Sequence, residues 1–193
     1  SEIVKDVMDF SAAICDTDGN MIAQAKTVAL HLGAVPEAMG VVLEQYGDGL
    51  VPGDAVILND PYQGGMHLPD IFMFMPIFDA NENLQGFSVV ICHHTDVGGR
   101  VAGSNASDST EIFQEGLRIP ALKLFEAGVP NDTLFKMIDI NVRLPDRVIG
   151  DLKAQFAACR TGARELGKMF DRYGAEMTST YFAELLDYAE RMT

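Results

Sequence analysis

The sequence predicts an α+β fold, with a mainly antiparallel or mixed sheet in the first two thirds followed by a C-terminal helix pair. Short apolar runs separated by turn residues fill the chain up to residue 92, whereas apolar residues recur every three or four positions after residue 148. Strands and helices that are segregated along the chain are typical of α+β domains, not of alternating α/β folds. We therefore expect a sheet-rich region at residues 1–143 and a helical hairpin at residues 144–193.

Turn residues delimit a series of strands in the first half of the chain. Asp18-Gly19 lies between two apolar runs and predicts a β-hairpin, because glycine tolerates the positive φ that tight turns require. The continuous apolar run Ile71–Phe78 is typical of a buried strand. We expect it to form a hairpin with Gly86–Cys92 through the centre of the sheet. The predicted strands are residues 9–16, 21–26, 54–58, 71–78 and 86–92.

One helix is predicted in the first third and two at the end. Pro36 suits the first turn of a helix over residues 37–46, because its missing N–H needs no partner there. Residues 95–115 are rich in Gly, Ser and Asn and predict a long loop, and such loops are usually functional or mobile. Helical periodicity then runs from Val148 to Tyr173 and from Met177 to Met192, which predicts an antiparallel helix pair.

The net charge and the cysteine content limit the classes of partner and the cellular compartment that we expect for this protein. Lys and Arg number 14 against 28 Asp and Glu, a net charge of −14, which disfavours nucleic acid and an anionic membrane surface as partners. No apolar run approaches the roughly 18–20 residues of a transmembrane helix. The three cysteines, Cys15, Cys92 and Cys159, are far apart in sequence, which argues against a disulfide framework and predicts a cytoplasmic location.

Three of the four histidines lie at the ends of predicted strands, among carboxylates. His67 and Asp70 are three residues apart and could bind one ion from a single loop. If residues 71–78 pair antiparallel with residues 86–92, Asp70 and His93 become neighbours. Imidazole and carboxylate together are the ligand set of zinc, manganese and non-haem iron sites. The pattern therefore favours a metal site at one end of the sheet.

Other interpretations of these residues remain open. Strand alternation places His93 and His94 on opposite faces, so at most one is a ligand while the strand stays regular, and the other would support the site or face a substrate. Alternatively, the histidines are partly buried loop residues hydrogen-bonded to carboxylates. His31 is interpreted as structural, and Cys92 as a small buried hydrophobic residue, not a nucleophile. Gly98–Gly103 lacks the Gly-Lys-Ser/Thr ending of a phosphate loop.

Five motifs, in order along the chain, resemble the hydantoinase B/oxoprolinase family. They are Asp9-Phe10-Ser11, His31-Leu32-Gly33, Asn59-Asp60-Pro61-Tyr62 through His67-Leu68-Pro69-Asp70, His93-His94-x-Asp96-Val97-Gly98-Gly99, and Glu111-Ile112-Phe113-Gln114-Glu115-Gly116. The resemblance extends from about Asp9 to Met192. This family includes the B-type subunits of ATP-dependent N-methylhydantoinase, the C-terminal half of 5-oxoprolinase, and the corresponding subunits of acetone and acetophenone carboxylases.

The resemblance implies a metal-containing B-type subunit that works with a separate A-type subunit that binds ATP. The A-type subunit would phosphorylate the carbonyl oxygen of a lactam, hydantoin or ketone, and the B-type subunit would complete hydrolysis or carboxylation at a divalent zinc, manganese or iron ion. His94 or Asp96 would orient the attacking water or shuttle its proton. By position, the resemblance assigns four metal ligands: Asp9, His67, Asp70 and His93. Asp9 rests on the resemblance alone.

We therefore expect the metal-binding part of an ATP-dependent amidohydrolase of cyclic amides. A B-type subunit of a ketone carboxylase and a non-catalytic assembly subunit are the alternatives. Family members are much longer and usually carry basic residues where this chain has Val7-Met8. The chain is accordingly expected to be a fragment or one piece of a split subunit. Its expected partners are the remainder of the B-type subunit and the A-type subunit.

Overall fold

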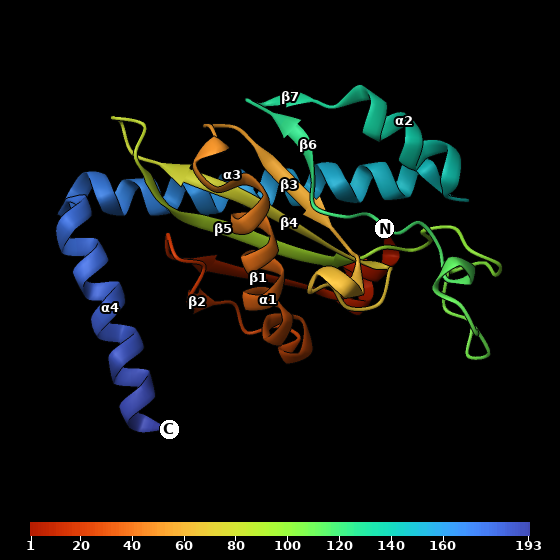
Figure 1. Cartoon of the computed structure of the whole chain (residues 1–193), viewed down its shortest axis with the longest axis horizontal. Coiled ribbons are helices and arrows are strands. Elements are labelled where there is room, and N and C mark those ends of the chain that lie inside the picture. The colour runs from red at the N-terminus through yellow and green to blue at the C-terminus, as the bar shows by residue number, and fades with distance from the viewer.

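A computed structural model describes all of residues 1–193. Its centre is a seven-stranded sheet in the order β2-β1-β5-β4-β3-β6-β7, in which every neighbouring pair is antiparallel (Figure 1). The strands are β1 (Phe10–Cys15), β2 (Met21–Gln24), β3 (Ala55–Leu58), β4 (Asp70–Phe78), β5 (Leu84–His93), β6 (Leu122–Glu126) and β7 (Val129–Pro130). Three of the four α-helices follow the last strand along the chain, and the predicted α+β class is confirmed.

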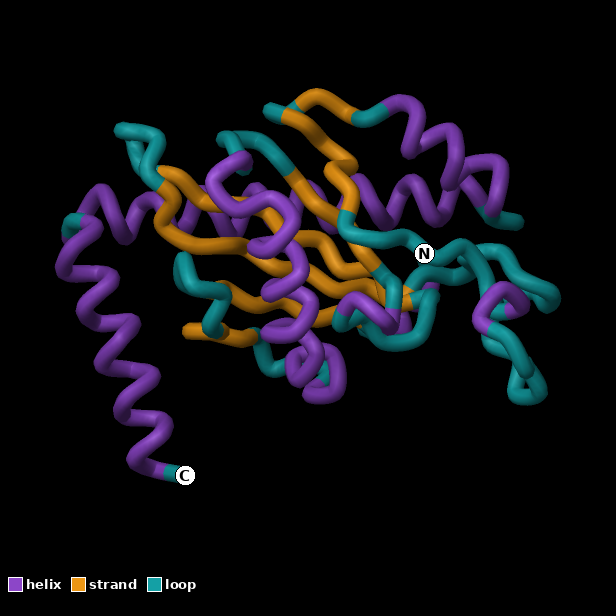
Figure 2. The backbone as a smooth tube through the Cα atoms, viewed as in Figure 1, coloured by secondary structure: helices purple, strands orange, loops and turns teal.

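Helices cover both faces of the sheet. Helix α1 (Ala29–Tyr46) lies across one face, and the long helix α3 (Pro145–Tyr173) lies across the other (Figures 1 and 2). Along β4, Phe72 packs in the core beneath α1, whereas its neighbour Met73 packs in the core beneath α3. Burial on both faces is the reason that β4 is apolar at nearly every position and not only at alternate ones.

Both predicted hairpins are present. β1 pairs with β2, and β4 pairs with β5 at the centre of the sheet. The two connections use the same device, in which a carboxylate accepts the backbone N–H four residues on: Asp16 from Asn20 at 2.8 Å, and Asp79 from Asn83 at 2.9 Å. These side chains satisfy amides that the ladder leaves without partners, which stabilises each tight connection.

Helix α1 begins eight residues earlier than predicted. The expected start at Glu37 was wrong, because α1 starts at Ala29 and Pro36 lies inside the helix. A proline within a helix removes one N–H that would otherwise bond four residues back. The buried side chains Leu32 and Val35 precede Pro36 and pack on the sheet, and this burial offsets the lost hydrogen bond. The consequence is that His31 lies on the first turn of a helix.

Several elements lie where no element, or only a loop, was predicted from the sequence. β6, β7 and the helix α2 (Asp132–Asn141) follow the long glycine-rich segment, and the Asn131 side chain caps α2 by accepting the N–H of Leu134 at 3.1 Å. Residues 95–115 contain only one short turn of helix, so the predicted loop is confirmed. The short helical turns of the whole chain are η1 (Ile3–Val7), η2 (Gly47–Gly49), η3 (Pro61–Gln63) and η4 (Ile112–Gln114).

The two C-terminal helices are present, but they are not an antiparallel pair. Figure 1 shows α4 (Ala175–Met192) turning away from α3 after Gly174, and the helices meet near this bend, where the rings of Phe170 and Phe182 are 6.2 Å apart. Most of the apolar stripe of α4 is therefore exposed: Met177, Tyr181, Leu185, Tyr188 and Met192. The periodicity identified the helix, but it carries no information about which surface covers that stripe.

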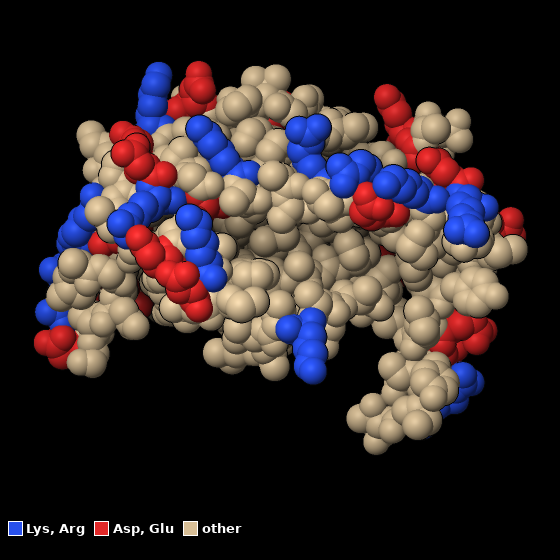
Figure 3. Space-filling model, turned by 180° about the vertical axis from the view of Figure 1, so that it is seen from behind, with Lys and Arg blue, Asp and Glu red and all other residues tan.

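Charged side chains of both signs are spread over the α3 face of the molecule. In Figure 3 basic side chains form a band across the upper part of this face with acidic groups among them, and the projecting α4, at the lower right, carries side chains of both signs. None of the helices combines the length with the apolar character that crossing a membrane requires.

Gly162 sets how closely α3 approaches the sheet. A Cβ at this position would collide with the Ser88 side chain on β5, whose own Cβ would be only 3.3 Å away, whereas Gly150 in the same helix has open space around it. We expect Gly162→Leu to lower the free energy of unfolding by about 1–3 kcal/mol through overpacking. Gly150→Leu, the matched control, should raise it by about 0.5–1 kcal/mol through helix propensity. Chemical denaturation measures both, and equal stability of the two variants would contradict the close packing.

Candidate metal centre

Three strands bring acidic and imidazole groups to one rim of the sheet. β5 runs antiparallel to both β1 and β4, so the end of β5 lies beside the starts of its two neighbours. Asp70 is directly opposite His93 in the ladder, and the His93 N–H donates to the carbonyl oxygen of Asp9 at 3.0 Å. The expected proximity of Asp70 and His93 is therefore confirmed. Alternation places all three side chains on the face that α1 covers.

His67 completes a compact cluster with Asp70 and His93. One possible ligand atom from each residue lies within 4.8 Å of the others. His67 Nε2 is 2.9 Å from Asp70 Oδ2, and the rings of His67 and His93 are 4.9 Å apart. The Asp70 side chain is 3% exposed, whereas that of His67 is 39% exposed. The cluster is therefore enclosed on the strand side and open on the His67 side.

The loop before β4 is held in place from both ends. Asp70 N–H donates to the His67 carbonyl oxygen at 3.0 Å, a tight turn that directs the His67 ring back onto the Asp70 carboxylate. The Asn59 side-chain amide donates to the Leu68 carbonyl oxygen at 2.6 Å. A Cβ on Gly65 would lie 2.6 Å from the Asn59 carbonyl oxygen, so only glycine permits this close approach. Asn59 and Gly65 thus fix the position from which His67 reaches the rim.

Two buried polar atoms of the cluster lack hydrogen-bond partners, namely Asp70 Oδ1 and His93 Nδ1. Buried polar atoms in proteins are nearly always satisfied, because an unmet one costs free energy. Both atoms are of types that bind divalent metal ions, and they belong to residues whose ligand atoms converge. The residues present therefore fit a metal ion.

The environment shifts the two imidazoles in opposite directions. The hydrogen bond to Asp70 raises the pKa of His67, because it stabilises the charged ring. Burial lowers the pKa of His93, because a low-dielectric site disfavours the charged ring. At neutral pH His93 is therefore in the neutral form that ligates metals, whereas a metal at His67 would compete with a proton.

Asp9 and His31 lie at the edge of this cluster. Asp9 is not among the three converging residues, but its Oδ1 is 3.4 Å from His31 Nε2. The same Nε2 is 3.6 Å from Asp70 Oδ1. The sequence pattern favoured a structural role for His31, whereas the structure places it between two of the candidate ligands. A predicted helix that began at Ala29 would have placed His31 on the first turn of α1, and this turn lies at the rim.

His94 lies on the opposite face of the sheet, as strand alternation predicted. Its side chain is completely buried, and its Nε2 is 2.9 Å from Gln155 Oε1 on α3. The Gln155 amide in turn donates to the Ile71 carbonyl oxygen at 2.8 Å. The structure therefore does not bring the His94 ring to the cluster. His94 is connected to it through the backbone that it shares with His93.

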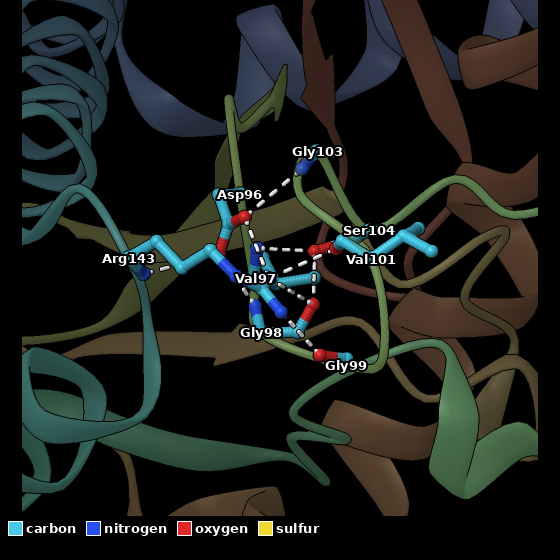
Figure 4. Close-up of polar contacts among 8 residues, drawn as sticks. All are labelled: Asp96, Val97, Gly98, Gly99, Val101, Gly103, Ser104 and Arg143. Carbon is cyan, nitrogen blue, oxygen red and sulfur yellow. Dashed lines mark hydrogen bonds and ion pairs between the residues drawn. The ribbon is translucent and has the colours of Figure 1, made fainter.

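Asp96 organises the glycine-rich loop that follows β5. Its carboxylate accepts the N–H groups of Gly98 at 2.8 Å, Gly103 at 3.0 Å and Arg143 at 3.1 Å (Figure 4). The Arg143 guanidinium also donates to Asp96 Oδ2 at 2.9 Å and to loop carbonyl oxygens, including that of Val101. Asp96 is thus occupied with backbone and Arg143, and the structure does not join it to the His67 cluster.

Cys92 is enclosed in the sheet beside this rim. It is buried, and burial raises the pKa of its thiol to about 12. A thiol that keeps its proton at neutral pH is a poor nucleophile. The position thus supports the interpretation of Cys92 as a small core residue.

A family model described as hydantoinase B/oxoprolinase matches residues 1–193. The chain belongs to the hydantoinase B/oxoprolinase family. It is 37% identical over 183 residues to the beta chain of the caprolactamase of Pseudomonas jessenii, covering 95% of this chain and 31% of that one. It is 32% identical to a Pseudomonas protein named for the B component of a D-/L-hydantoinase, covering 100% of this chain and 33% of that one. The chain thus spans about a third of the length of these relatives.

Two solved structures share the fold. The crystal structure of the ATP-dependent caprolactamase from Pseudomonas jessenii superposes with a TM-score of 0.89 at 37% identity, covering 95% of this chain and 32% of that chain. A nucleotide-free structure of acetone carboxylase gives a TM-score of 0.86 at 21% identity, covering 94% of this chain and 24% of that chain. At that identity the second likeness shows the fold alone.

The Asp96 clamp predicts a defined loss of stability at low pH. Burial alone would raise the pKa of Asp96, but the hydrogen bonds from Arg143, Gly103 and Gly98 outweigh it and hold the pKa below its usual value. A lowered pKa in the folded state means that this stabilisation is complete above the ordinary Asp pKa and is lost as the pH falls through the folded-state pKa.

We therefore expect Asp96→Asn to lower the free energy of unfolding at pH 7 by about 1–3 kcal/mol. The difference from the unsubstituted chain should shrink as the pH falls below the ordinary Asp pKa of about 4. Urea denaturation at several pH values measures this. A difference that stays constant with pH would show that the charge of Asp96 contributes nothing.

Proposed function

We propose that this chain is the metal-binding part of a B-type subunit of an ATP-dependent hydrolase of cyclic amides. The observation that carries this proposal is the cluster of His67, Asp70 and His93, which leaves two buried ligand-type atoms unsatisfied in a chain of the hydantoinase B/oxoprolinase family. Membership in the family supports the reaction class, and the cluster supports the place within this chain where the reaction occurs.

The ion would be divalent zinc, manganese or iron. His67, Asp70 and His93 would hold it, with Asp9 as a fourth ligand that approaches from the start of β1. Two imidazoles and two carboxylates suit any of these ions and would neutralise a charge of +2. When bound, such an ion lowers the pKa of a coordinated water towards about 7, which supplies a nucleophile at neutral pH.

The protein residues divide the remaining tasks by their position. Asp70 lies in the ladder and fixes the site to β4, whereas the partly exposed His67 borders the side from which a substrate can approach. His94 and Asp96 were expected to orient or deprotonate water. Because both are engaged elsewhere, we propose that they act by positioning: His94 holds the end of β5 against Gln155, and Asp96 holds the loop that follows.

A separate A-type subunit would bind ATP and phosphorylate the carbonyl oxygen of the cyclic amide. The glycine-rich segment Gly98–Gly103 has no Gly-Lys-Ser/Thr ending to bind a triphosphate. The caprolactamase structure is described as ATP-dependent, and its beta chain matches 95% of the present chain. The A-type subunit and the remainder of the B-type subunit are thus the proposed partners.

Hydrolysis of a cyclic amide is favoured over carboxylation of a ketone by the comparisons. The caprolactamase is 37% identical to this chain, whereas the acetone carboxylase is 21% identical and supports only the fold. A non-catalytic assembly subunit is the remaining alternative. The converging imidazoles and carboxylate argue against an assembly subunit without a site. Unsatisfied ligand atoms in the core cost free energy, and in such a subunit no bound ion would offset that cost.

Removing either of two ligands should empty the metal site. We expect His67→Ala and Asp70→Ala to lose the stoichiometric ion and, in the complete enzyme, all ATP-coupled turnover. Mass spectrometric metal analysis and circular dichroism measure occupancy and folding.

His94→Ala is the matched control, since it removes a histidine from the same sheet end on the opposite face. It should retain the ion and lower the turnover rate. A fully occupied His67→Ala variant would disprove the ligand role, and loss of the ion from His94→Ala would show that the wrong member of the pair had been chosen.

The division of labour between subunits gives a second test. We expect the purified chain to hydrolyse no ATP, and hydrolysis coupled to cyclic amide opening to require addition of the A-type subunit. Phosphate release from ATP is the measurement, with the A-type subunit alone as the control. ATP hydrolysis by the purified chain at the rate of the complete enzyme would contradict this assignment.

A further inference from the structure

His31 is the one histidine on the α1 side of the rim that the proposed ligand set leaves unused. It lies on the first turn of α1 and is 3% exposed. Its Nε2 lies 3.4 Å from Asp9 Oδ1 and 3.6 Å from Asp70 Oδ1, at nearly equal distances from two carboxylates. A buried polar ring in this position needs a physical reason, because a core residue of similar size would pack there without polar atoms.

The Nδ1 side of the His31 ring also has a polar partner. Its Nδ1 is 3.0 Å from the hydroxyl oxygen of Ser11 on β1, and the Val28 carbonyl oxygen, just before α1 begins, is a second acceptor 3.3 Å from the same hydroxyl. An unprotonated Nε2 would direct its lone pair at two carboxylate oxygens, so the ring hydrogen belongs on Nε2, and the Ser11 hydroxyl then donates its single hydrogen to Nδ1. Ser11 thus fixes a ring whose Nε2 faces Asp9 and Asp70 at ion-pair distance.

The two carboxylates come from strands that are not adjacent. β1 and β4 are separated by β5 in the sheet. Neighbouring strands are about 4.8 Å apart, so the backbones of Asp9 and Asp70 are separated by about twice that distance. No backbone hydrogen bond joins β1 to β4, and two carboxylates that face the same imidazole nitrogen repel each other. A donor placed between them opposes this repulsion and links the two strands across β5.

We propose that His31 is a positioning residue that holds Asp9 and Asp70 in the mutual arrangement needed to bind one metal ion. This inference rests on the proposed metal site and adds to it the residue that sets its geometry. His31 is not itself a ligand in this assignment, because its Nε2 is directed at carboxylate oxygens that are themselves ligand atoms. Removing it should change metal affinity without removing a donor atom from the ion.

The experiment compares two substitutions of similar size. His31→Gln keeps an N–H donor at the place of Nε2, whereas His31→Leu fills the space without one. Titration of the purified protein with manganese chloride, followed by calorimetry, gives the dissociation constant. We expect His31→Leu to weaken binding about 10–100-fold, as is typical for residues that orient metal ligands. His31→Gln should restore most of the affinity, and Ser11→Ala should weaken it in the same direction.

Two controls separate positioning from general destabilisation. Cys159→Ala truncates a fully buried core side chain of α3 on the opposite face and should leave manganese affinity unchanged. Electron paramagnetic resonance of the manganese-loaded protein should show the same number of nitrogen ligands in His31→Leu as in the unsubstituted protein. Loss of one nitrogen signal would make His31 a ligand and overturn the proposal. Unchanged affinity in His31→Leu, or equal weakening in His31→Leu, His31→Gln and Cys159→Ala, would overturn it as well.

Failure of the proposed metal site would look different. The unsubstituted protein would then bind no manganese, zinc or ferrous ion, and no variant would change that result. If the unsubstituted protein binds metal and His67→Ala does not, the metal site stands. The comparison of His31→Leu with His31→Gln then decides the role of His31 alone.

Discussion

The register between β5 and its two neighbours is the constraint on which the site depends. Asp70 lies opposite His93, and the His93 N–H bonds to Asp9 at the same end of the sheet. Side chains alternate between faces, so a shift of β5 by one residue would move His93 to the α3 face and His94 to the α1 face. The cluster would then lose a member. Every candidate ligand outside the His67 loop is thus set by one backbone ladder.

Different packing on the two faces holds that register. The α1 face presents large side chains such as Phe72 and Phe87 to the helix, whereas the α3 face admits the close approach of Gly162. On the α3 face His94 is bonded to Gln155, whose amide is bonded to β4. Leaving those buried polar groups unpaired by a shift would cost free energy. The adjacent residues His93 and His94 therefore differ in role: His93 belongs to the cluster, whereas His94 holds the strand in register.

Much of this arrangement could be predicted from the sequence, because it depends on local patterns. Apolar runs identified β4 and β5, and their pairing placed Asp70 beside His93. The place of His31 beside Asp9 and Asp70 was missed because Pro36 was taken as a helix start, although burial of the preceding turn offsets the lost hydrogen bond. The partner of Asp96 is Arg143, 47 residues away, and no local pattern links them. The direction of α4 likewise depends on surfaces that periodicity does not describe.

The proposed ligands all lie within this chain, although the chain spans only about a third of its relatives. Asp9, His67, Asp70 and His93 come from one sheet rim and the loop beside it, so no other domain is needed to bring them together. In the proposed assignment, metal affinity would depend on strand register and on His31 within this chain. Turnover would further need the phosphorylated substrate and the surfaces that deliver it to the open His67 side. Binding and catalysis are therefore separable, and a defect in one can be measured without the other.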